Sequence, residues 1–175
     1  MEKLFAGKIS ASHRQFYFHD SEFDDVEELF GDEDKLVKGL SKHGFYGTRS
    51  FVAFASHTEN WGHWLEVFLS DVPPTPDDCE LLIAVPISVA SGELSVHGPS
   101  EWQGQLFNVE PGTYCVYFFG YNFGVDINSL GDELADQVIE HSEQFENYPQ
   151  LERYKIVLVP GKCPKKGVLY SSKKK

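Results

Sequence analysis

The sequence contains few cysteines. Three are present in 175 residues (Cys79, Cys115 and Cys163), with no CxxC pair and no cysteine–histidine spacing typical of a zinc site. A domain of this length buries enough surface to fold without disulfides or metals. Because Cys115 lies in an apolar, strand-like segment, we expect it to be a reduced thiol in or near the core. A reducing cytosol is therefore the expected compartment.

Long hydrophobic runs are also missing. No apolar run approaches the ~20 residues that span a bilayer. The first residues, Met1–Ala6, lack the hydrophobic region of a signal peptide. These absences lead us to expect a cytoplasmic protein that does not enter a membrane.

Positive charge is in deficit. The sequence contains 15 Lys and Arg residues and 27 Asp and Glu residues, which gives a net charge of −12. Nucleic-acid binding requires basic patches, so we do not expect it. An acidic balance favours solubility, which is common among cytosolic proteins, and it also favours steering toward a basic protein partner. Seven of the lysines follow residue 154, so the charge is unevenly distributed.

Catalytic motifs are missing as well. The sequence has no G-x-S-x-G elbow, no HExxH motif and no phosphate-binding glycine loop. His57 and His63 flank a loop that also contains Glu59, and these three residues are the best metal candidates, whereas Cys79 and Cys163 have no predictable base nearby. We expect a protein that is not an enzyme and has neither metal nor cofactor. A further hypothesis is a hydrolase whose metal ligands or catalytic thiol come together only in the folded structure, from residues far apart in sequence.

What the sequence does contain is a series of short strands. Residues 81–89 alternate with a period of two, and Pro86 within them predicts a sheet edge or a bulge. Residues 90–92 turn into a second strand, and Pro111-Gly112 forms a turn before residues 113–119. This pattern predicts a mainly β fold, an antiparallel β-sandwich of about seven to nine strands. Further strand-like segments lie at 4–18, 51–55, 63–70, 105–109, 152–160 and 168–170.

Near the C-terminus the period changes from two to that of a helix. Leu130, Leu134, Val138 and Phe145 form one stripe and acidic residues the other side, which predicts a C-terminal helix over about 129–146 before the final strand. We expect a single β-sandwich domain over 1–170 and a flexible basic tail over 171–175.

The acidic block at residues 20–34 is the sharpest functional candidate. It combines nine carboxylates with four apolar residues, which a disordered tail would not need. It predicts a docked helix or ordered loop with a negative face that imitates a nucleic-acid backbone. The residues expected to bind the partner, with two tryptophans as anchors, are Asp24, Asp25, Glu27, Glu28, Asp32, Glu33, Asp34, Trp61 and Trp102.

Aromatic residues in the loops leave an alternative open. Trp61, Trp64, Trp102 and Phe123 lie in or beside loops, where aromatic rings stack on sugars, anchor a protein interface or plug the ends of a core. The alternative function is a β-sandwich module that binds a carbohydrate or another small ligand.

Several segments together resemble the competence protein J family: residues 9–20 (ISASHRQFYFHD), 76–80 (PDDCE) followed by 84–89 (AVPISV), 92–96 (GELSV) and 109–114 (VEPGTY). Ile87 replaces the phenylalanine usual in the family's V-P-F-x-V strand, and the C-terminal helix and strand are read as an extension. The resemblance implies an inhibitor of a DNA-entry nuclease, similar to immunity proteins that protect a cell from a nuclease toxin. It implies no particular binding residues.

Overall fold

Two β-sheets form the body of the protein. The computed structural model describes residues 1–23, 33–59, 62–101, 104–140 and 142–172, with only the backbone for 33, 139–140 and 142–144. The six-stranded sheet has the order β1 (Glu2–Ile9), β5 (His63–Leu69), β10 (Arg153–Pro160), β9 (Gly112–Tyr121), β6 (Leu81–Val89), β11 (Gly167–Ser171). The five-stranded sheet has the order β3 (Phe45–Gly47), β4 (Phe51–Ala55), β2 (Gln15–Asp20), β7 (Glu93–His97), β8 (Gln105–Asn108).

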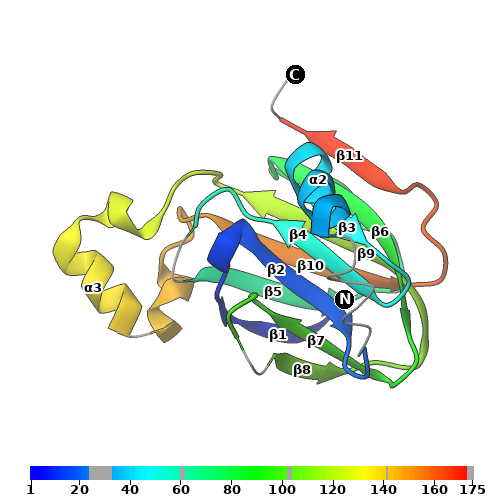
Figure 1. Cartoon of the computed structure of the whole chain (residues 1–175). Coiled ribbons are helices and arrows are strands. Elements are labelled where there is room, and N and C mark those ends of the chain that lie inside the picture. Colours follow the sequence, from blue (N-terminus) through cyan, green and yellow to red (C-terminus); the bar gives the residue numbers. More distant parts are fainter. Residues whose placement is uncertain (24–32, 60–61, 102–103, 141, 173–175) are drawn as a thin grey trace.

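The predicted mainly β fold is confirmed, with eleven strands in the described ranges instead of seven to nine (Figure 1). One pair departs from the antiparallel prediction, because β10 runs parallel to β5 with Ile156 opposite Val67. β10 also pairs antiparallel with β9 along its whole length. The final long strand therefore occupies the centre of the six-stranded sheet, and the C-terminal region is integral to the fold.

The main hydrophobic core lies between the two sheets. Phe54 of the five-stranded sheet stacks on Phe118 of the six-stranded sheet, with ring centroids 4.1 Å apart. The period-two pattern of β6 has a direct structural cause. Ile83 and Val85 face this core, whereas Leu82 and Ala84 belong to a second apolar cluster on the outer face of the same sheet.

Pro86 lies where the sequence predicts it, at an edge. β11 pairs with β6 only over Leu81–Ala84, so beyond Ala84 the strand has β9 as its one described sheet neighbour. Proline lacks the backbone N–H that pairing with a strand on the second side would need, and at Pro86 no described strand pairs on that side.

The helices differ from the prediction. The single helix expected over 129–146 is instead a 3₁₀ turn η2 (Ile127–Leu130), the helix α3 (Asp132–Glu140) and a second 3₁₀ segment η3 (Ser142–Asn147). Gly131, at φ 85°, separates η2 from α3, because a left-handed backbone ends a helix. The structure also contains an unpredicted helix, α2 (Glu33–His43), whose Leu36 is buried on the five-stranded sheet. In the described residues no helix is long and apolar enough to cross a membrane.

Two buried groups correct further expectations. Cys115 is not a reduced thiol, because it forms a disulfide with Cys163 at a Cα–Cα distance of 4.8 Å. The spacing of 48 residues between these cysteines gave no indication of the pairing. Asp20, counted in the acidic block, is buried and accepts hydrogen bonds from the backbone N–H groups of Ala90, Ser91 and Glu22. Its carboxylate fixes a turn and adds nothing to an acidic surface.

Candidate partner-binding surface

Most of the residues predicted to bind a partner lie outside the described part of the chain: Asp24, Asp25, Glu27, Glu28, Asp32, Trp61 and Trp102. Glu33 and Asp34 are the first residues of α2. Asp34 is exposed and lies 3.6 Å from Lys38 one helical turn later. An exposed pair of this kind contributes little to stability, so Asp34 remains available to a partner.

The two flanks of the acidic block are anchored on the same surface. Phe23, just before the undescribed residues, stacks on Phe51 with centroids 5.4 Å apart. Leu36, just after them, is buried in the same cluster with Phe51 and Tyr17 on the outer face of the five-stranded sheet. Of the four apolar residues counted in the acidic block, Phe23 packs on this surface, whereas the prediction for Val26, Leu29 and Phe30 falls on residues outside the described part of the chain.

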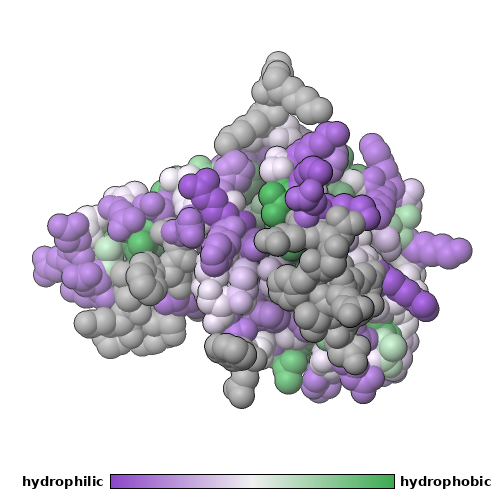
Figure 2. All heavy atoms as spheres, in the orientation of Figure 1, coloured by the Kyte–Doolittle hydropathy of each residue, from purple (hydrophilic) through white to green (hydrophobic). Residues whose placement is uncertain are grey.

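A second acidic surface lies mostly within the described residues. We call residues 122–152 the acidic lobe. It holds eight Asp and Glu residues and no Lys or Arg. Around α3 it projects from one end of the sheets, at the left of Figure 1, and that end is strongly hydrophilic in Figure 2. Its exposed described carboxylates include Asp132, Glu133, Asp136 and Glu146.

A small core of its own holds the acidic lobe together. Val138 of α3 and Phe145 of η3 are buried with Leu151 and Ile127, and Trp64 of β5 packs against them. Trp64, one of the loop aromatics considered for ligand stacking, thus serves to attach the lobe to the sheet. Asp132 and Glu133 lie in the first turn of α3, where the helix dipole stabilises negative charge.

Glu152 joins the lobe to the rest of the molecule. Its side chain is buried and accepts hydrogen bonds from Gly124 N–H (2.9 Å), His57 N–H (2.8 Å), Thr58 N–H (3.2 Å) and the Tyr154 hydroxyl. Burial acts to raise the pKa of this carboxyl, but these donors together with His63 lower it below its ordinary value. The sequence offers no signal for this role, since Glu152 precedes β10 as any surface residue might.

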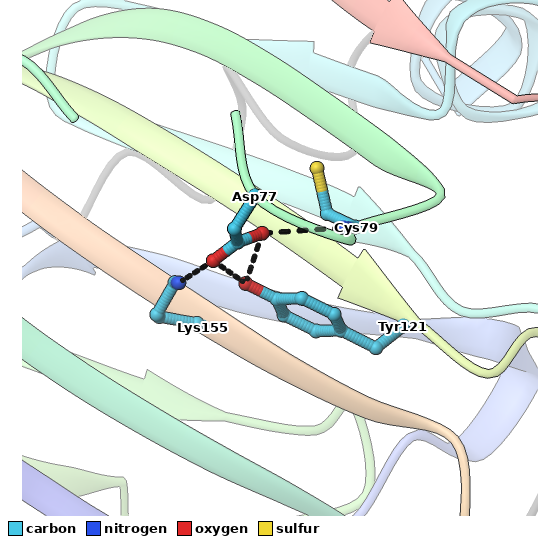
Figure 3. A network of polar contacts seen from close by, with 4 residues as sticks. All are labelled: Asp77, Cys79, Tyr121 and Lys155. Atoms are coloured by element: carbon cyan, nitrogen blue, oxygen red, sulfur yellow. Dashed lines mark hydrogen bonds and ion pairs between the residues drawn. The ribbon is translucent and has the colours of Figure 1, made fainter. Parts of the chain in front are cut away.

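A polar network on the outer face of the six-stranded sheet surrounds Cys79 (Figure 3). Its geometry bears on the hypothesis that a cysteine is the nucleophile of a hydrolase. Asp77 accepts hydrogen bonds from Tyr121 (3.0 Å) and from the Cys79 backbone N–H (3.2 Å), and it forms a 2.6 Å ion pair with Lys155. The Cys79 thiol is buried, and burial followed by the charge of Asp77 raises its pKa. A raised pKa disfavours the thiolate, and Cys163 is in a disulfide. Neither cysteine has the properties of a nucleophile.

The metal candidates of the 57–63 loop are not brought together. The His57 ring stacks on Phe123 at 4.0 Å, whereas His63 is buried with its Nε2 atom 3.3 Å from the Thr58 carbonyl oxygen. Over the ranges that the structure describes, no group of three His, Cys, Asp or Glu residues could hold a metal ion. Phe123, the described loop aromatic, and Phe45 of β3 pack against the inter-sheet core, which favours a structural role for both.

Fold and surface together define a two-sheet β protein that presents carboxylates from a lobe at one end. The family model described as Competence protein J (ComJ) matches residues 8–145, which include most of the lobe. The chain belongs to the ComJ family, and the resemblance predicted from the sequence is confirmed.

Two solved structures share the fold. One is the crystal structure of ComJ, inhibitor of the DNA degrading activity of NucA, from Bacillus subtilis, with 13% identity and a TM-score of 0.57 over 91% of this chain and 98% of that one. The other is "Crocagin biosynthetic gene J", with 17% identity and a TM-score of 0.52 over 93% of this chain and all of that one. At these identities the likeness concerns the fold alone. No curated protein matches the sequence.

Proposed function

We propose that this protein is a non-enzymatic inhibitor of a nuclease or nuclease toxin, and that it acts as an immunity protein. Membership of the ComJ family carries the proposal, because the Bacillus subtilis protein of that fold inhibits the DNA-degrading activity of NucA. The acidic surface gives the proposal a physical mechanism.

The mechanism is occupation of the nuclease's substrate groove. A nuclease holds the phosphate backbone of DNA with Lys and Arg side chains. Carboxylates of the acidic lobe and of the block at 24–34 would meet these cations in place of phosphates. Because complementary charge accelerates association, binding would be fast at low salt and slower at high salt.

Two acidic surfaces supply the contacts in this proposal. The lobe offers Asp132, Glu133 and Asp136 on one short helix, held in place by the buried Val138. The block is tethered at both ends by Phe23 and Leu36. Anchoring of this kind limits the ordering cost that a partner's binding energy must otherwise offset.

The test is a titration of nuclease activity. A candidate partner nuclease is purified, and plasmid degradation is followed as the amount of inhibitor increases. We expect stoichiometric loss of activity that weakens between 50 and 500 mM salt. Retention of full nuclease activity and no detectable complex at micromolar inhibitor would contradict the proposal.

A further inference from the structure

An open pocket of about 1140 Å³ lies between α2 and the edge strand β11. It is slightly larger than the roughly 300–1,000 Å³ of typical small-molecule sites. Its apolar wall includes Leu40 of α2, Phe45 of β3 and Leu81 of β6. Val37 and Val168, on opposite sides, are 56% and 42% exposed, so apolar surface is open to solvent here. In Figure 2 hydrophobic atoms are visible beside the hydrophilic surface of α2.

The charge of this pocket is opposite to that of the whole protein. Its lining contains Arg14, Lys42 and Lys166 and the imidazoles of His13, His43 and His57, but no described Asp or Glu. Carboxylates outnumber Lys and Arg by 27 to 15 in the chain, so a lining without an acid departs from its composition. Apolar walls with cations around them fit a ligand that has an apolar body and an anionic group.

Helix chemistry explains only part of this charge. Lys42 and His43 lie in the last turn of α2, where cations compensate the helix dipole. Arg14 comes from the turn before β2, and Lys166 comes from the turn before β11. Three separate segments therefore bring their cations to one hollow, and the dipole of α2 accounts for one of them.

The turn that carries Arg14 has an unusual backbone. His13 and Arg14 have φ values of 58° and 57°, and neither is a glycine. The turn is fixed by hydrogen bonds from Arg14 N–H to Ala11 O (3.0 Å) and from Ser56 N–H to Arg14 O (2.9 Å). Left-handed backbone in such residues is uncommon and concentrates at ligand-binding and active sites. This turn places two basic side chains in the pocket lining.

We propose that the pocket binds an amphiphilic organic anion, an aromatic or aliphatic body that carries a carboxylate, phosphate or sulfonate group. The body lies against Leu40, Phe45 and Leu81, and the anionic group is held by Arg14, Lys42 and Lys166. This site is independent of the acidic surfaces and does not require a nuclease partner.

The test uses the fluorescent probe 8-anilinonaphthalene-1-sulfonate, which has an aromatic body and one sulfonate. N-phenyl-1-naphthylamine has the same body without the charge and serves as the matched probe. We expect saturable binding of the anionic probe at one site and markedly weaker binding of the neutral one. In a proton–nitrogen correlation spectrum of the full chain, the amides of Gly44 and Gly167 should shift with the anionic probe.

The matched variants are Lys42→Gln/Lys166→Gln and Lys162→Gln/Lys165→Gln. All four lysines are exposed, so both variants should fold, and both remove two positive charges. Lys162 and Lys165 do not line the pocket. We expect the first variant to weaken probe binding about tenfold and the second less than about twofold, where tenfold corresponds to about 1.4 kcal/mol. Equal effects of the two variants, equal binding of the two probes, or shifts confined to other amides would overturn the proposal.

Discussion

The acidic lobe and the basic pocket are opposite in charge and in construction. The lobe holds eight Asp and Glu residues and no Lys or Arg, and six of the eight lie on α3 and η3, over a small core of its own. The pocket is hollow and gathers cations from three segments: the turn before β2, the last turn of α2 and the turn before β11. A convex acidic surface suits a large basic partner, whereas a hollow with cations suits a small anion. This contrast underlies the proposal that one sandwich carries two surfaces for different classes of partner.

Glu152 links these two regions, and its removal should have the largest effect. Its carboxylate accepts from Gly124 at the start of the lobe and from His57 in the pocket lining. Glu152→Leu deprives several buried donors of their acceptor, so the free energy of unfolding should fall by about 3–5 kcal/mol. Urea denaturation measures this change. Glu146→Leu, at an exposed site in the same lobe, should change it by less than about 0.5 kcal/mol. Equal losses would show that Glu152 does not join the regions.

The next prediction tests whether the acidic lobe unfolds locally without affecting the basic pocket. Val138 is fully buried in the core of the lobe. Val138→Ala should cost about 2 kcal/mol and increase amide hydrogen exchange in residues 125–148. The pocket amides of Gly44 and Gly167 should keep their wild-type exchange rates. A simultaneous increase at both places would mean that the lobe has no independent stability.

Acid should weaken the junction in two stages. Burial lowers the pKa of His63, so the unfolded ring takes up a proton below about pH 6.5 while the folded ring stays neutral. The lowered pKa of Glu152 also makes the folded state less stable as the pH falls, because the carboxyl binds a proton at about pH 4.3 in the unfolded chain and only at lower pH in the folded one. The free energy of unfolding should therefore fall from pH 7 to pH 4, by up to about 1.4 kcal/mol per pH unit for each proton. His63→Gln should flatten the slope between pH 7 and 5. An unchanged slope in that variant would exclude His63 as its origin.

The cysteines give the smallest predicted effect, a change in reactivity. Of three cysteines, Cys115 and Cys163 are paired and Cys79 is buried. Alkylation followed by mass spectrometry should find no modified thiol in the native protein, one in the unfolded protein and three after reduction. Three reactive thiols without reductant would contradict the disulfide and restore the expectation of a reduced Cys115.

Local patterns in the sequence predicted many of the strands but not how they pair. The alternation of β6 and the position of Pro86 led directly to a half-covered strand, because both depend on neighbours along the chain. The parallel pairing of β5 with β10 and the disulfide could not be predicted, since each joins residues far apart in sequence. The same holds for the pocket, whose Arg14, Lys42 and Lys166 have no shared motif.

For the proposed partner-binding surface, the sequence predicted the acidic character but not which carboxylates are exposed. A surplus of carboxylates is visible in the composition, and the acidic side of α3 is visible in its helical period. Asp20 shows the limit of that reasoning, because a carboxylate counted as surface charge is a buried acceptor for three backbone N–H groups. Burial depends on tertiary contacts, which composition does not contain.

The central claim is that acidic side chains direct this protein to a nuclease, and association kinetics test it most directly. The variant Asp132→Asn/Glu133→Gln/Asp136→Asn and the variant Asp24→Asn/Asp25→Asn/Glu27→Gln/Glu28→Gln are compared with a control, Glu2→Gln/Asp71→Asn/Glu110→Gln, at exposed positions elsewhere. Stopped-flow measurements with the nuclease that the protein inhibits, at low salt, should show at least one acidic-surface variant about tenfold slower in association, and the control within about twofold of wild type. Association rates that fall equally in all three variants, or in none, would contradict the account.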